Sequence, residues 1–490
     1  MAVHDPCRLL ERLLVEPNEQ EWLEFKRDNI DPEKLGRNVS ALANSAMLAD
    51  RERAFIVYGI EDTSKKKIGT KVRLNTEKQG GEDLHNWLAR LLDPRITIEF
   101  LDFDCDGQRF SIVVIEPSFD RPVSFSGTEY VRVGQNTRKL REFPERERAL
   151  WLATGRRKFE DAIALSNQTA EQVFEKLDIS ASYDLADEEK PTSDAEIINK
   201  LIRREYIVDN MEGGYDITNL GAILFAKNIQ EFPSISGKAV RVIKYAGTDK
   251  RKSESEQEGV LGYAAGFARM LRYILGRIPS EEFYKDGVRR MVPLIPEIAV
   301  REVLANALIH QDFTIYGSAP LVEIYSNRVE VTNPGASLID VDRMIDERGS
   351  RNEKLARAMR GLGLCEERGG GLDKALLAIE IRQLPAPDFT SSNNAMRVTL
   401  FGPKPFSKMS KSEKMRACYY HSVIRYVTHE YMSNSSLRER FSLSDEEYQS
   451  VSTVISQAIK AGRIVPADPE QGKRNARYVP YWARAEITAE

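Results

Sequence analysis

Carboxylates and a lysine lie close together near the start of the chain, in the segment 19–26 (EQEWLEFK). Polar and apolar residues alternate there, which predicts an extended strand with Glu24 and Lys26 on one polar face. A later apolar run ends in GIED, where Asp62 offers another carboxylate at a strand end. Carboxylates from these two stretches would hold Mg or Mn, which activates water and polarises a phosphodiester, while lysine stabilises the developing charge. The alternative is an exposed strand with ordinary salt bridges, because this spacing is not specific.

A second set of polar residues, Glu302, Asn306 and His310, recurs every four positions in a stretch that predicts a helix. The three side chains therefore share one stripe, which must face solvent or a polar ligand because burying it without partners is costly. Two predicted strands follow at 321–325 and 328–332, and a glycine run at 369–371 opens another helix. Glycines before a helix let backbone amides approach phosphates, although such a run also occurs at helix ends and hinges.

The last part of the chain predicts a short helix at 436–441, a second helix opened by a capping box at 444–447, and a hairpin. This order describes a winged helix, which commonly places its second helix in the major groove and its wing on the DNA backbone. Four residues of the wing are candidate phosphate contacts, namely Arg463, Lys473, Arg474 and Arg477. The acidic residues 445–447 leave a protein-interaction or dimerisation module equally open.

The composition is that of a globular protein, with 41% hydrophobic and 30% charged residues in 490. The net charge of -4 gives no general attraction to phosphate backbones, so a nucleic-acid surface must be local. No apolar run approaches the roughly 20 residues that cross a bilayer, and the charged start predicts no signal peptide, so we expect no membrane contact and a cytoplasmic location. The scattered cysteines and histidines predict neither disulfides nor structural zinc. No Gly-x-x-x-x-Gly-Lys-Ser/Thr phosphate loop occurs, which disfavours a helicase.

The pattern of elements predicts an α+β multidomain protein. Four domains are expected, at 1–157, 158–290 (a linker with connecting helices and strands), 291–405 and 406–490. In the first domain the sequence predicts a helix at 31–49, strands at 55–60 and 129–133, and a hairpin at 95–115. In the second it predicts a linker at 181–191 and a solvated loop at 249–258.

The first domain resembles the Schlafen-type AlbA-like domain over residues 17–142. The resemblance rests on the EFK and GIED motifs, the intervening segment 41–45 (ALANS) and the later stretch 130–138. It implies a nucleic-acid domain and, by comparison with Schlafen nucleases, an active site formed by Glu19, Glu24 and Asp62, with Lys26 beside them. The family's Gly-Gly after the ALANS segment is absent, which alters a loop. A basic edge for phosphate contact, with a solvated face as the alternative, is formed by Arg132, Arg138, Lys139 and Arg141.

Residues 293–385 resemble the GHKL ATPase fold in its RecG-like carboxyl-terminal variety, through the 302–310 helix, the Asn333-Pro-Gly335 turn and the glycine run. The resemblance implies ATP with Mg or Mn, Glu302 as the general base and Asn306 as a contact to metal and phosphates. It also places Asn333 and Gly335 beside adenine and Gly369 and Gly371 beside phosphate. His310, on the same helix stripe as Glu302 and Asn306, is a further candidate cofactor contact. Asn333 replaces the family's aspartate, but an amide oxygen still accepts a hydrogen bond. Segment 348–352 is either a lid or an exposed basic loop. GHKL relatives often dimerise, so a homo-oligomer is expected by analogy.

Two functions fit these motifs. One is an ATP-controlled, metal-dependent endonuclease acting on RNA or DNA, with a role in stress or antiviral defence. The other is an ATP-responsive DNA-binding transcriptional regulator that cuts nothing. Glu19, Glu24 and Asp62 separate them, because a binding protein gains nothing from carboxylates near phosphates unless a metal neutralises them.

Overall fold

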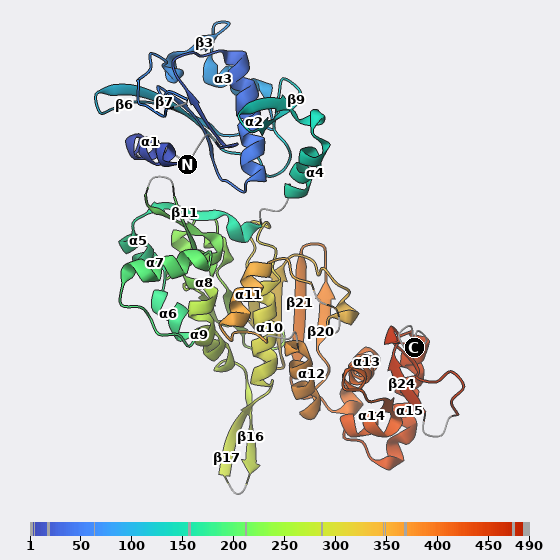
Figure 1. Cartoon of the computed structure of the whole chain (residues 1–490). Coiled ribbons are helices and arrows are strands. Elements are labelled where there is room, and N and C mark those ends of the chain that lie inside the picture. Colours follow the sequence, from blue (N-terminus) through green and yellow to red (C-terminus); the bar gives the residue numbers. More distant parts are fainter. Residues whose placement is uncertain are drawn as a thin grey trace. The chain divides into compact units, whose positions relative to one another are not determined.

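The computed structural model describes residues 3, 5–16, 20–62, 64–154, 158–210, 213–285, 288–345, 347, 349–366, 370–472 and 476–483. Four residues singled out above lie outside the described residues, namely Glu19, Gly369, Lys473 and Arg474. The chain divides into two compact units (Figure 1). The first unit comprises Met1–Glu171 and Leu201–Thr218, and the second Gln172–Lys200 and Asn219–Glu490.

The first unit is built on a four-stranded sheet in the order β1-β2-β7-β6, in which β1 and β2 are parallel. These strands are β1 (Leu23–Lys26), β2 (Ala54–Tyr58), β6 (Ile98–Cys105) and β7 (Gln108–Ile115). A second sheet runs in the order β10-β9-β8-β5, with β5 (Leu92–Asp93), β8 (Ser124–Phe125), β9 (Thr128–Val133) and β10 (Asn136–Lys139). The helices are α1 (Pro6–Val15), α2 (Pro32–Leu48), α3 (Leu84–Leu91) and α4 (Pro144–Ala153). Short strands β3 (Lys78–Gln79) and β4 (Glu82–Asp83) form a hairpin.

Helix α2 begins where the sequence predicts, because the Asp31 side chain accepts a hydrogen bond from the backbone N–H of Lys34 (3.1 Å) and Pro32 opens the first turn. Asn44 ties the helix to two other segments through its amide, which donates to the carbonyls of Val123 (2.9 Å) and Tyr130 (2.7 Å). Ser45 accepts from the backbone N–H of Arg132 (2.9 Å). The polar residues of the ALANS segment therefore anchor α2 rather than face a ligand.

A small sheet in the order β11-β13-β12 completes the first unit, with β11 (Ile163–Gln168), β12 (Ile207–Asp209) and β13 (Tyr215–Thr218). The helices along this part of the chain are α5 (Ala170–Lys176), α6 (Ile179–Asp184), α7 (Asp194–Arg203), α8 (Asn219–Phe225) and α9 (Tyr263–Leu275). The predicted linker at 181–191 begins inside α6, where Tyr183 is buried, so that part of the prediction is wrong.

The second unit contains a six-stranded sheet in the order β15-β14-β18-β19-β21-β20. Its strands are β14 (Arg241–Tyr245), β15 (Ser253–Glu258), β18 (Leu321–Ile324), β19 (Arg328–Pro334), β20 (Asp388–Ser391) and β21 (Ala395–Phe401). The helices are α10 (Glu297–Ile309), α11 (Glu353–Gly361) and α12 (Gly371–Ile381), and α10 packs against α12 and β19. Strands β16 (Ser280–Lys285) and β17 (Val288–Pro293) form a separate two-stranded sheet (Figure 1).

This sheet corrects two predictions. Residues 253–258 were predicted within a solvated loop, but they form the edge strand β15, which pairs with β14. The prediction missed this strand because it is mostly exposed and its side chains are polar, so it lacks the alternation of apolar residues that indicates a strand. Strand β14 in turn pairs with β18, so the sheet extends across the predicted boundary at 290/291. The α+β class is confirmed.

Residues 410–483, here called the carboxyl-terminal module, follow the predicted order of helices and hairpin. They comprise α13 (Lys411–Val427), β22 (Met432–Ser433), α14 (Asn434–Arg440), α15 (Tyr448–Lys460), β23 (Ile464–Pro466) and β24 (Arg477–Pro480), with sheet order β22-β24-β23. The core of the module includes Leu376 of α12 and Ile345, so it is continuous with the preceding part of the second unit. Assignment of the module as a winged helix stays a prediction. No helix among the described residues has both the length and the apolar character that crossing a membrane requires.

Candidate functional site

The second unit contains a cavity of about 360 Å³ between α10, β19, the start of α12 and the segment 336–351. Five of the residues that the sequence singled out line it, namely Glu302, Asn306, His310, Asn333 and Gly371. The four-residue spacing on α10 places the first three on one stripe, as predicted. Apolar side chains from other elements also line the cavity, namely Leu338, Ile339, Met344, Phe389, Met396 and Val398.

Glu302 lies on the buried part of the stripe and is 1% exposed. Burial raises the pKa of its carboxyl, and the neighbouring Arg301 guanidinium, which forms an ion pair with it, acts in the opposite direction. Helix α12 begins directly against this carboxylate, since a Cβ at Gly371 would lie 2.1 Å from Glu302 Oε2. A carboxylate of raised pKa can accept a proton from water, and the missing side chain at Gly371 leaves the space that this carboxylate occupies.

His310 ends α10 and contributes an imidazole to the cavity wall. Burial, together with the positive charges of Arg351 and Arg360, lowers its pKa to about 4. The imidazole is therefore neutral near pH 7, where one ring nitrogen accepts and the other donates a hydrogen bond.

The stability of the second unit should fall on acidification because of His310. Its pKa is lower in the folded chain than the usual 6.5, so the unfolded chain binds more protons between about pH 6.5 and pH 4. Folding stability attributable to this group is present above pH 6.5 and is lost as the pH falls toward 4. Thermal unfolding measured at several pH values should show a smaller loss across that window for His310→Gln than for the parent. An equal loss in both proteins would contradict the assignment.

Asn333 near the end of β19 and Gly335 directly after this strand have different roles. Asn333 is 5% exposed, and its side-chain N–H donates to the carbonyl of Pro334 (3.3 Å), which leaves the amide oxygen as an acceptor. Gly335 adopts a φ of +98°, and a Cβ there would lie 2.7 Å from Cβ of Asp312 and 2.9 Å from a guanidinium nitrogen of Arg351. Gly335 therefore permits close packing beside the cavity and is not among its lining residues.

The segment predicted as a lid or exposed loop is anchored at its carboxyl end. Arg351 lines the cavity and donates to the carbonyls of His310 (3.3 Å) and Ala336 (3.2 Å). Asn352 is buried and donates to the carbonyls of Ile309 (2.7 Å) and Gln311 (2.8 Å). These contacts fix the segment to the end of α10. Sequence reasoning missed this role of Arg351, because its partners are backbone carbonyls that no spacing reveals.

The carboxyl-terminal module contacts two parts of the chain that also contribute to the cavity, the segment around Asp342 and helix α12. The Tyr419 hydroxyl donates to the backbone carbonyl of Asp342 (2.5 Å), and Arg463 forms an ion pair with the Asp342 carboxylate. The predicted phosphate contact Arg463 is therefore engaged within the chain. Arg477 is exposed.

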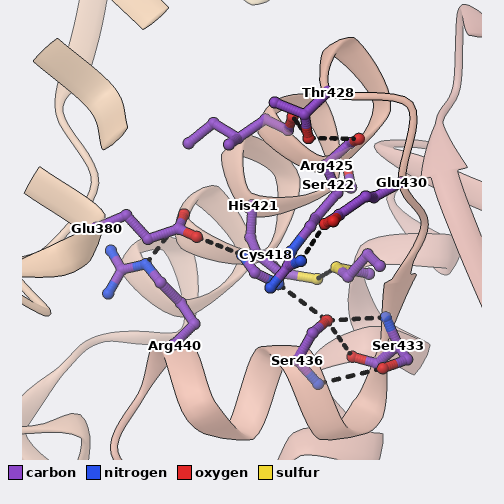
Figure 2. A network of polar contacts seen from close by, with 12 residues as sticks. Glu380, Cys418, His421, Ser422, Arg425, Thr428, Glu430, Ser433, Ser436 and Arg440 are labelled. Atoms are coloured by element: carbon purple, nitrogen blue, oxygen red, sulfur yellow. Dashed lines mark hydrogen bonds and ion pairs between the residues drawn. The ribbon is translucent and has the colours of Figure 1, made fainter. Parts of the chain in front are cut away.

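Helix α12 carries the second connection to the module, a buried network that Figure 2 shows. Glu380 lies 2.6 Å from Nδ1 of His421 on α13 and 3.4 Å from Nε of Arg440 on α14. The other ring nitrogen of His421 contacts the Ser436 hydroxyl (3.0 Å). Because α12 also contributes Gly371 and Leu372 to the cavity, one helix touches both the cavity and the core of the module.

In the first unit, Glu24 and Lys26 lie together as predicted, but not on a solvent-facing surface. Glu24 is 4% exposed and its carboxylate lies 3.1 Å from a guanidinium nitrogen of Arg132 and also pairs with Lys26. Arg132 is 2% exposed, so its assignment to an exposed basic edge is wrong, because its charge neutralises Glu24 in the interior. Arg138 and Arg141 are exposed and Lys139 is half-buried, which leaves these three as the basic edge.

The predicted metal site is incomplete in the described residues. Asp62 is exposed in the turn after β2, while its neighbour Glu61 is held by Arg27 and Ser64. Within the part of the chain that the structure describes, no three His, Cys, Asp or Glu side chains are grouped to hold a metal ion. Glu19, the third predicted ligand, lies outside that part.

Comparisons with known proteins address the two domains separately. Residues 19–141 match the family model described as "Schlafen, AlbA_2", and residues 317–400 match the model described as "Putative ATP-dependent DNA helicase recG C-terminal". No curated protein matches the chain. A crystal structure of the DIP2311 protein from Corynebacterium diphtheriae is similar, with 17% sequence identity, a TM-score of 0.43 and coverage of 98% of each chain.

The two family matches fall where the sequence predicted them, on the first unit and on the six-stranded sheet of the second. They support a nucleic-acid-related protein with an ATPase-type domain. The chain thus joins a Schlafen AlbA-like domain to a RecG-like carboxyl-terminal domain.

Proposed function

We propose that the chain is an ATP-responsive nucleic-acid-binding protein, in which ATP bound in the cavity of the second unit changes how tightly the chain holds RNA or DNA. The observation that carries the proposal is the grouping of Glu302, Asn306, His310 and Asn333 around one cavity at the start of α12. The match of residues 317–400 to a RecG-like carboxyl-terminal domain supports the nucleotide, and the AlbA-like match supports the nucleic acid.

The side chains present fit a nucleoside triphosphate with its metal. The apolar wall formed by Met344, Phe389 and Met396 suits a base, and the buried Asn333 oxygen can accept from an exocyclic amine. Asn306 would contact the phosphates and a magnesium ion, which neutralises phosphate charge when it is bound. Glu302 would orient and deprotonate a water molecule, since its carboxyl is buried and its pKa is raised.

The endonuclease hypothesis has less support from this geometry than the binding hypothesis. A metal ligand must offer free carboxylate oxygens, and both oxygens of Glu24 already contact cations. Removing Glu24 from Arg132 would leave a guanidinium buried without its counter-charge, which is costly. The exposed Arg138 and Arg141 remain available for phosphate backbones without any cleavage. A transcriptional or defence role would rest on such binding.

Adding MgATP should change the affinity of the full chain for nucleic acid by about 5- to 150-fold, the usual range of coupling between two sites. Fluorescence anisotropy with labelled tRNA, single-stranded DNA and duplex DNA measures this with and without MgATP. Asn306→Ala should remove the effect of ATP and leave binding in its absence intact. No ATP binding, or no nucleic-acid binding under any condition, contradicts the proposal.

Gel analysis of the same samples with Mg or Mn detects cleavage of the nucleic acid, and so distinguishes an endonuclease from a protein that only binds. Cutting by the parent that is lost in Glu24→Gln, under conditions in which thermal unfolding shows that the variant is still folded, would establish the nuclease and overturn a purely binding role.

A further inference from the structure

A groove of about 920 Å³ lies in the carboxyl-terminal module, along one face of α15 and against the start of α14 and strand β24. Residues of α15 from Tyr448 to Lys460 line it at the spacing of one helix face. Serine and asparagine side chains around the start of α14 also line it, namely Ser433, Asn434, Ser435 and Ser436, and Asn434 bonds to Ser452 of α15 (3.0 Å). The groove is distinct from the nucleotide cavity and shares no lining residue with it.

The charges that line the groove are mostly positive. Four cations line it, namely Arg425, Arg438, Lys460 and Arg477, against the single carboxylate of Glu430. Glu430 is paired with Arg425, as Figure 2 shows, and Arg438 is paired with Asp445. Lys460 and Arg477 are exposed, and no ion pair engages either of them within the described residues. These two cations are therefore available to an anionic ligand.

Aromatic rings lie beside these cations. Tyr431 is 45% exposed and Tyr448 is 50% exposed, although both are large side chains that burial would favour. The Arg477 guanidinium lies 5.5 Å from the centre of the Tyr431 ring, so a cation and an aromatic face are presented together. Exposed aromatic faces next to cations are what a single strand requires, because its unpaired bases stack while its phosphates pair. A duplex, whose bases are already stacked, would not use the tyrosines.

We propose that this groove binds single-stranded nucleic acid, with phosphates on Lys460 and Arg477 and bases stacked on Tyr431 and Tyr448. The inference rests on the proposed function and names the surface that serves it. Arg463 of the predicted wing takes no part, since it is paired with Asp342. The acidic residues 445–447 precede α15, whereas Lys460 ends it, so phosphates are favoured toward the carboxyl end of that helix.

The test is the affinity of the full chain for labelled oligo(dT), oligo(U) and a duplex of the same length, measured by anisotropy at several salt concentrations. The double variant Lys460→Glu/Arg477→Glu should bind both single strands at least tenfold more weakly. Its salt slope should be shallower by about 1.4, the value for two lost phosphate contacts on a single strand. Tyr431→Ala should weaken single-strand binding by about tenfold without changing that slope.

The matched control is Lys408→Glu/Lys411→Glu, which makes a charge-reversing change at two exposed lysines outside the groove, one just before the module and one at its start. It should bind nearly as the parent does. If the parent binds single strands and the groove variant binds them equally well, the groove assignment fails and the proposed function stands. A preference of the parent for duplex overturns the single-strand assignment. If the parent binds no nucleic acid with or without MgATP, both proposals fail.

Discussion

Asn306→Ala should lower the affinity of the chain for MgATP by about 100-fold. Asn306 lies between Glu302 and His310 on the stripe of α10 that faces the cavity. In the proposed nucleotide site its amide would contact both the phosphate oxygens and the metal. Hydrogen bonds to charged groups contribute about 1.5–3 kcal/mol each, which is a factor of about 10 to 150 in affinity. Isothermal titration calorimetry of MgATP into the full chain measures the change directly.

The control for this substitution is Asn327→Ala, which removes the same amide from the exposed turn between β18 and β19. This variant should bind MgATP as the parent does. Equal affinity of Asn306→Ala and the parent would remove the nucleotide-site hypothesis, provided that the variant shows the thermal unfolding of the parent. Gly335 does not enter this test because it packs beside the cavity instead of lining it.

Glu24→Ala should lower the free energy of unfolding of the first unit by about 3–5 kcal/mol. The two cations around Glu24 differ in what they can do when it is removed. Lys26 has a side chain that is 29% exposed and can turn toward water, whereas the side chain of Arg132 is 2% exposed and cannot. The variant would therefore leave a guanidinium in the interior without its carboxylate. Urea unfolding followed by tryptophan fluorescence reports this, since Trp22 and Trp87 are buried in the first unit.

A matched control lies three residues earlier. Glu21 forms a two-pronged ion pair with Arg146 at 2.8 Å for each oxygen, but both side chains are about one-third exposed. Glu21→Ala should cost only about 1 kcal/mol, because water screens the exposed pair. If Glu24→Ala also lowers the free energy of unfolding by about 1 kcal/mol or less, Arg132 does not hold the Glu24 carboxylate. Glu24 would then be free to bind a metal ion, as the endonuclease hypothesis requires.

The sequence predicted much of the lining of the cavity in the second unit, because three of these residues are close together in the chain. The stripe Glu302, Asn306, His310 is a local pattern that the geometry of one helix converts into a surface. Asn333 and Gly371 come from separate elements, and the structure places both in the lining of the same cavity, whereas the roles that the GHKL resemblance implies for them stay a prediction. The α+β class and the two domain types followed from motifs of the same local kind.

What the sequence missed depends on contacts between distant residues. The sequence around Arg132 predicts a basic edge, but Arg132 pairs with Glu24, which is 108 positions away in the chain. The alternation in β1 indicated a polar face, and no local signal showed that the second sheet and α2 would bury that face. Strand β15 was missed for the opposite reason, since an edge strand in solvent lacks the apolar alternation that marks a strand.

The shared core of α12 and the carboxyl-terminal module determines where the chain can be shortened. Ending it at residue 405, the predicted domain limit, would remove His421 and Arg440 and leave Glu380 without either partner. It would also uncover Leu376 and Ile345, which pack in the core of the module. A shortened ATPase-type domain would thus be destabilised at the helix whose first residue touches Glu302. Nucleotide binding by the second unit is best measured on protein that retains residues 406–483.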